Sequence, residues 1–84
     1  MNKNLKAFKV TFEHTDTFGG EANYSWVKRG TLDIPEGTSD RGIVARVKKE
    51  LGMTGVKCDV NNFGNSLTIK PRRICQIIFI TFED

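Results

Sequence analysis

Only one stretch of this sequence, residues 40–51, spaces its apolar side chains as a helix does. Those side chains, at Ile43, Val44, Val47 and Leu51, fall within one arc of about 100°, which suits a helix lying across a sheet. The runs on both sides of it instead alternate apolar and polar residues in period two, the pattern of strands with one buried face. The sequence therefore predicts an α+β domain with a single helix.

The alternating runs predict five strands, at residues 8–13, 22–34, 56–60, 66–70 and 74–82. With the helix they give the order ββαβββ, a single antiparallel-rich sheet with one amphipathic helix packed on one face. We expect a turn over residues 14–20 and a bulge or bend near Gly30, which interrupts an apolar face. The last run is apolar on both parities, which predicts a strand in the interior of the sheet.

The length and composition indicate one folded domain spanning residues 1–84. The chain has 84 residues, 38% hydrophobic and 27% charged, which suffices for one modest core. Two cysteines, Cys58 and Cys75, lack the spacing of metal ligands and fall in apolar strand patterns, so we expect reduced core residues. There is no membrane-spanning run and no signal-peptide core, so we expect a cytoplasmic protein without membrane contact.

The basic charge is concentrated in one segment. The net charge is +3, yet residues 41–73 carry eight basic and two acidic side chains. Two interpretations stay open, a contact surface for nucleic acid or an acidic protein, and a solvated helix face followed by a basic turn. On the first interpretation, the candidate partner-binding residues on the helix and the turn are Arg41, Lys48, Lys49, Arg72 and Arg73.

Two further candidates, Tyr24 and Arg29, belong to the second strand. Tyr24 lies near the first turn, where we expect it to be exposed, and an aromatic side chain beside basic ones suits a protein interface or stacking on bases. Trp26 could form an aromatic pair with Tyr24 in such an interface, but it has the parity of Leu32 and Ile34, so we expect it to be a core residue covered by the helix.

One helix cannot cover both faces of a five-stranded sheet. If one parity of the last strand faces the helix, then Cys75, Ile77 and Phe79 point to the second face, where they would form a contact patch for a partner or a second copy of the chain. A curled sheet that buries both parities explains the same pattern, and the sequence leaves both interpretations open.

The sequence does not support an enzyme. His14 is the one histidine, and we expect it to lie in a surface turn. The Gly19-Gly20 pair lacks the lysine and the following helix of a phosphate-binding loop. Three carboxylates, Glu13, Asp16 and Glu21, lack the spacing of a calcium loop. We therefore expect no catalytic residue, no metal and no cofactor.

A distinctive run, Asp16-Thr17-Phe18-Gly19-Gly20-Glu21-Ala22-Asn23-Tyr24-Ser25-Trp26-Val27, resembles small uncharacterised proteins of tailed phages and prophages. Residues 35–41 and 51–58 are similar in character to those proteins. The resemblance assigns no role to any residue, and it implies a protein that binds a host macromolecule, counter-defence proteins included.

These observations favour a non-enzymatic interaction protein that binds a host protein in the host cytoplasm. The alternative is a small nucleic-acid-binding domain that uses the basic helix face and the basic turn against phosphates. A homodimer formed through the second face of the sheet is a further expectation.

Overall fold

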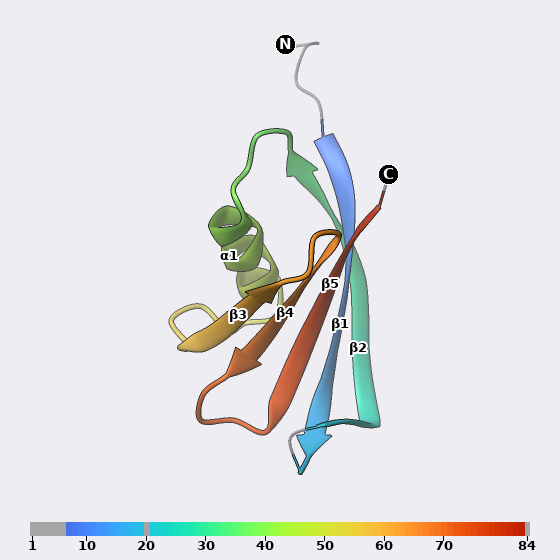
Figure 1. Cartoon of the computed structure of the whole chain (residues 1–84), viewed down its shortest axis with the longest axis vertical. Coiled ribbons are helices and arrows are strands. Elements are labelled where there is room, and N and C mark those ends of the chain that lie inside the picture. Colours follow the sequence, from blue (N-terminus) through green and yellow to red (C-terminus); the bar gives the residue numbers. More distant parts are fainter. Residues whose placement is uncertain (1–6, 20, 84) are drawn as a thin grey trace.

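The chain folds as one five-stranded antiparallel sheet with a helix on one face, in the order ββαβββ (Figure 1). This computed structural model describes residues 7–19 and 21–83, so Gly20 of the expected first turn lies outside the described residues. The elements are β1 (Ala7–Phe18), β2 (Glu21–Pro35), α1 (Asp40–Glu50), β3 (Cys58–Asn62), β4 (Ser66–Pro71) and β5 (Gln76–Glu83). The predicted α+β architecture is confirmed.

The strands lie in the order β2-β1-β5-β4-β3, and each neighbouring pair is antiparallel. β5 is therefore the central strand, as its apolar residues of both parities predicted. In the described part of the chain, no helix is long and apolar enough to cross a membrane.

The core lies between α1 and the sheet. Ile43, Val44 and Val47 are the buried residues of the helix. Among the described residues, the strands contribute seven buried apolar side chains to this core: Val10, Phe12, Ile34, Leu67, Ile69, Ile78 and Ile80. The Ser39 side chain caps the helix by accepting a hydrogen bond from the backbone N–H of Gly42 (3.2 Å). This cap starts the helix where the sequence predicted it.

The bulge expected near Gly30 is absent, because Gly30 pairs with Phe12 in a regular register. A Cβ atom at Gly30 would lie 2.5 Å from Cζ of the buried Phe12 ring. Glycine interrupts the apolar pattern here because the ring of the neighbouring strand occupies the space of its side chain.

β1 is longer than the sequence indicated. Residues 14–18, expected in a turn, continue the strand, and the chain reverses around Gly19, which has a positive φ of 62°. His14 is consequently a buried strand residue with 6% exposure, not a surface turn residue. The β1–β2 hairpin extends well beyond α1 (Figure 1).

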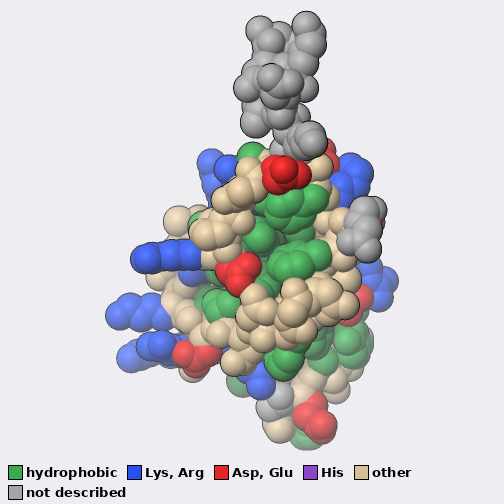
Figure 2. Space-filling view, turned by 45° about the horizontal axis from the view of Figure 1, so that its top comes forward, with side chains coloured by type: hydrophobic (Ala, Val, Ile, Leu, Met, Phe, Trp, Pro, Cys, Tyr) green, Lys and Arg blue, Asp and Glu red, His purple; other side chains and the backbone are tan. Residues whose placement is uncertain are grey.

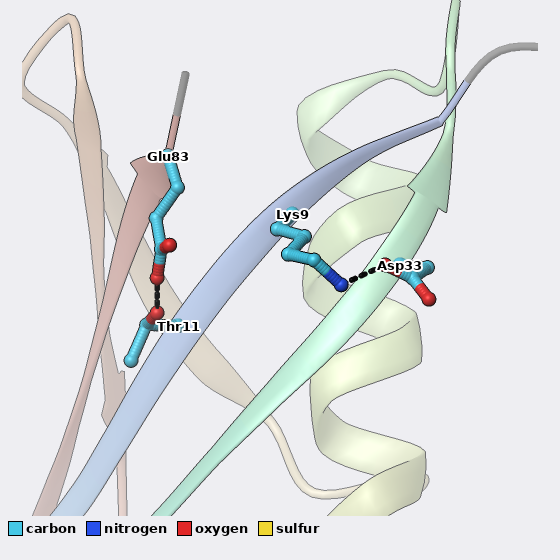
Figure 3. Close-up of polar contacts among 4 residues, drawn as sticks. All are labelled: Lys9, Thr11, Asp33 and Glu83. Atoms are coloured by element: carbon cyan, nitrogen blue, oxygen red, sulfur yellow. Dashed lines mark hydrogen bonds and ion pairs between the residues drawn. The ribbon is translucent and has the colours of Figure 1, made fainter.

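The second face of the sheet carries polar contacts between neighbouring strands. Lys9 of β1 pairs with Asp33 of β2 (2.9 Å), and Thr11 donates to Glu83 of β5 (Figure 3). The hydrogen bond and the charge of Asp33 raise the pKa of Lys9. Such exposed ion pairs are screened by water and contribute little to stability.

The predicted apolar patch on this face is largely buried. Ile77 is buried beside the fully buried Thr15, its partner in the β1–β5 register, and Phe79 is half-buried. Cys75 precedes β5 and is exposed, so its assignment to the core was wrong, and Cys58 is half-buried. The curled-sheet interpretation therefore describes Ile77 better than the open patch.

Candidate contact surface at the uncovered end of the sheet

α1 lies beside one part of the sheet, and the β1–β2 hairpin and the β4–β5 turn project beyond it at the other end (Figure 1). Large apolar side chains are exposed at this end: Phe18 is 80% exposed, Tyr24 50%, Ile74 41% and Trp26 39%. We call these four residues the distal surface. Exposed aromatic side chains grouped at one end of a small domain are typical of contact sites.

An irregular bulge in β2 carries two members of the distal surface, Tyr24 and Trp26. Thr15 pairs with Val27, but the next pair is Thr17 with Ala22, so the four residues 23–26 lie opposite Asp16 alone. Tyr24, at the middle of the bulge, has a φ of 59°, in the left-handed region that a tyrosine rarely adopts. A bulge of this kind redirects side chains out of the regular pleat.

The Asp16 carboxylate holds the bulge in place. Its Oδ2 accepts a hydrogen bond from Nδ2 of Asn23 (3.0 Å), and its Oδ1 accepts one from the backbone N–H of Ser25 (2.9 Å). These bonds, with that from Asn23 foremost, outweigh desolvation and lower the pKa of Asp16 from 3.8 to about 2. Thr15 Oγ1 also donates to the carbonyl of Trp26 (2.7 Å). Hydrogen bonds that involve Asn23 and Ser25, the residues on either side of Tyr24, thus hold the backbone conformation of Tyr24.

Trp26 packs against His14 rather than in the core. The two rings meet edge to face with their centroids 4.8 Å apart. Nε2 of His14 donates to Oε1 of Gln76 (2.8 Å), while its buried Nδ1 has no hydrogen-bond partner among the described residues. The expectation that α1 covers Trp26 was wrong, because α1 ends before the sheet does.

The β4–β5 turn is joined to the hairpin. The backbone N–H of Thr17 donates to the carbonyl of Cys75 (3.0 Å), beyond the last β1–β5 pair, Asp16 with Gln76. Arg72 and Arg73 lie in this turn and are exposed. Three of the seven candidate residues, Tyr24 and the two arginines, therefore lie at the same end of the molecule.

The other four candidates lie elsewhere. Arg29 pairs with Glu13 (2.7 Å) on the second face of the sheet. Arg41 is in the first turn of α1, near the end of the sheet where β1 begins and β5 ends (Figure 1). Lys48 donates from Nζ to the carbonyl of Val56, and Lys49 is exposed in the last turn of α1.

Basic side chains project from the side of the molecule that carries α1, with acidic side chains among them (Figure 2). Lys49 and Arg46 line one cavity of about 410 Å³ together with Asp33 and Glu50. The helix cations thus have acidic neighbours and do not continue into the distal surface. The basic segment is consequently not a single stripe of positive charge.

Within residues 7–19 and 21–83, the side chain of His14 packs against the ring of Trp26 and is hydrogen-bonded to Gln76. No group of three or more His, Cys, Asp or Glu side chains in these ranges is placed to hold a metal ion.

Two members of the distal surface, Phe18 and Ile74, were missed as contact residues, and a third, Trp26, was assigned to the core. A signal for them existed in the predicted lengths of the elements. A helix of twelve residues is about 18 Å long, whereas a strand of thirteen residues spans about 43 Å. A helix beside such a strand leaves more than half of it uncovered, so apolar residues near the strand's start become exposed.

A scan against protein-family models found no match, and searches of curated proteins and of solved structures found none either.

Proposed function

We propose that this chain is a non-enzymatic binding protein and that its distal surface contacts a partner protein. The observation that carries the proposal is Tyr24, a half-exposed aromatic residue held at a positive φ by a bulge that Asp16 anchors. A non-glycine residue in this region costs about 1–3 kcal/mol and persists where the surroundings impose it, often at sites of function.

The chemistry of this end suits a protein partner. Tyrosine, tryptophan and arginine are the residues most enriched at the energetic centres of protein interfaces. Hydrogen bonds hold the backbone around Tyr24, and the Trp26 ring is packed on His14 before any partner binds, so less conformational entropy is lost on binding. Arg72 and Arg73 add positive charge at the same end of the sheet, which favours a partner with acidic residues.

The resemblance to phage and prophage proteins makes a bacterial host protein the proposed partner, and the host cytoplasm the proposed place of action. Counter-defence belongs to the same proposal, since it works by binding a host component.

Nucleic acid is the second candidate, favoured by the two exposed arginines at the end that carries Tyr24 and Trp26. Stacking of bases on aromatic side chains beside a basic turn would bind single strands with little sequence preference. Such binding weakens steeply as salt rises, whereas a mainly apolar protein interface responds weakly.

The test is retention of a bacterial protein by the tagged chain from lysate, with and without nuclease, followed by the Kd of the purified pair. The double variant Phe18→Ser with Tyr24→Asn removes both aromatic groups, and asparagine tolerates the positive φ at position 24. Phe63→Ser is the matched control, because Phe63 is an exposed aromatic residue in the β3–β4 turn, at the other end of the sheet.

We expect a protein that survives nuclease, at least about tenfold weaker binding in the double variant, and unchanged binding in Phe63→Ser. Retention that disappears after nuclease favours the nucleic-acid alternative. Equal losses in the double variant and in Phe63→Ser contradict the assignment of the distal surface.

A further inference from the structure

A cavity of about 360 Å³ opens beside the β4–β5 turn. Two residues that precede β3, Val56 and Lys57, line one side of it, and Arg72, Arg73 and Ile74 line the other. Three of these five side chains are cationic and two are aliphatic. The cavity that Lys49 lines on the helix side differs, because it contains both signs of charge.

Backbone contacts hold the two walls together. The backbone N–H of Arg72 donates to the carbonyl of Lys57 (3.0 Å), which continues the β3–β4 ladder beyond the pair of Cys58 with Pro71. Lys48 of α1 donates to the carbonyl of Val56 and fixes that wall to the helix. The cavity is therefore part of the folded framework and not a gap between loose loops.

The Arg72 guanidinium is oriented before any ligand binds. Its Nε and Nη2 both lie 3.0 Å from Oδ1 of Asp59. One oxygen of Asp59 thus occupies one edge of the fork, and the remaining N–H groups stay available to an anion. Among the described residues, Lys57 and Arg73 form no ion pair. Asp59 balances one of the three cations, so the site keeps a surplus of positive charge.

We propose that this cavity is a carboxylate site that receives a glutamate or aspartate side chain from an acidic segment of the partner protein. Arginine binds carboxylates through two parallel hydrogen bonds, and Arg73 with Lys57 supplies the donors that Arg72 does not. Val56 and Ile74 provide an apolar wall for the aliphatic part of the segment. The inference rests on the proposed function and names the chemistry of the partner.

The arrangement favours an acidic peptide over nucleic acid. A nucleic acid chain needs cations in line to meet successive phosphates. The exposed helix cation Arg41 lies near the opposite end of the molecule, and Lys48 already donates to a carbonyl. This cavity instead collects its cations around one point, with aliphatic groups beside them.

The test uses the ¹⁵N-labelled protein and a short synthetic peptide, acetyl-Leu-Glu-Glu-Leu-amide, with acetyl-Leu-Gln-Gln-Leu-amide as the neutral control. We expect saturable amide shifts confined to residues 56–58 and 72–75, and at least about tenfold weaker binding of the glutamine peptide. Arg73→Gln and Lys57→Gln weaken the acidic peptide, whereas Arg41→Gln, which removes the same charge elsewhere, leaves it unchanged.

Inorganic phosphate and a thymidine oligonucleotide complete the titration. Equal affinity for both peptides, equal losses in Arg41→Gln and Arg73→Gln, or tighter binding of the oligonucleotide at the same residues would each overturn the inference. Phosphate bound more tightly than the acidic peptide also overturns it, because the cavity then selects phosphate over carboxylate.

Failure here is distinguishable from failure of the proposed function. If Phe18 and Tyr24 are needed to retain the partner but Arg73→Gln leaves the Kd of the partner unchanged, the proposed function is supported and the carboxylate site is rejected. If the peptide binds as expected but the distal aromatic residues have no effect on retention, the carboxylate site is supported and the role of the distal surface is rejected.

Discussion

Beneath α1, the central strands contribute aliphatic side chains such as Val10 and Ile78 to one core cluster with Val47 of the helix, and all three are fully buried. Beyond α1, the hairpin and β5 place His14 and Gln76 on the same face of the sheet, joined by a hydrogen bond and covered by a partly exposed Trp26. The first region is held by burial of apolar area, and the second by a few directed contacts. Stability is therefore expected to concentrate in the covered region, leaving the distal end free to present unusual conformations.

The largest expected effect is in the covered region. Ile78→Ala removes a fully buried side chain from the central strand and leaves a cavity, which costs about 2–5 kcal/mol. Ile74→Ala, at the distal end, costs less than about 0.5 kcal/mol, because that side chain is already exposed. Urea unfolding of both variants measures the difference. Similar losses would mean that the distal end is as tightly packed as the core.

Gly30 offers a second test within the covered region. Gly30→Ala forces the buried ring of Phe12 to move, at a cost of about 1–3 kcal/mol. The double variant Gly30→Ala with Phe12→Leu removes the clash, so it is expected to be more stable than the sum of the two single changes. Additive losses in a double-mutant cycle would show that the ring does not limit residue 30.

The difference between the regions also explains what could be predicted from sequence. Period-two alternation reports which side chains are buried, and this indicated all five strands, the helix and the central position of β5. The extension of β1 was missed because Thr15 and Asp16 are polar and typical of turns. Thr15 is buried only because β2 and β5 pair on either side of it, through Val27 and Ile77.

The candidate site was also predictable only in part, because contacts between strands shape it and the alternation along one strand does not report them. Tyr24, Arg72 and Arg73 were identified by residue type and by their positions near turns. Trp26 was assigned to the core because its parity matches that of Leu32, and it does lie on the face of the sheet that carries α1, against His14. Parity predicts the face but not how far along the strand the helix reaches, and the contact that anchors the bulge, from Asp16, crosses between strands.

Acid is expected to loosen the bulge before the core. The folded pKa of Asp16 is about 2, below its ordinary value of 3.8, so its contribution to stability is complete above about pH 4 and is lost as the pH falls through 2. The amide signals of Asn23 and Ser25 should therefore shift together with an apparent pKa near 2, and Asp16→Asn should abolish that titration. A midpoint at the ordinary value would mean that Asp16 does not anchor the bulge.

The smallest expected change in stability comes from Tyr24→Gly, which tests whether the backbone conformation of Tyr24 serves binding or folding. Tyr24→Gly relieves a tyrosine of its left-handed backbone, which favours the folded state, while the added freedom of the unfolded glycine opposes it. The net change is expected to be stabilising by no more than about 1 kcal/mol. Binding of the partner protein should nevertheless weaken, because the aromatic group is gone. A variant of this kind, more stable and less able to bind, is the result expected of a residue whose conformation serves contact and not folding. If Tyr24→Gly instead destabilises the chain in urea unfolding, the tyrosine ring contributes to packing and the bulge belongs to the framework of the fold.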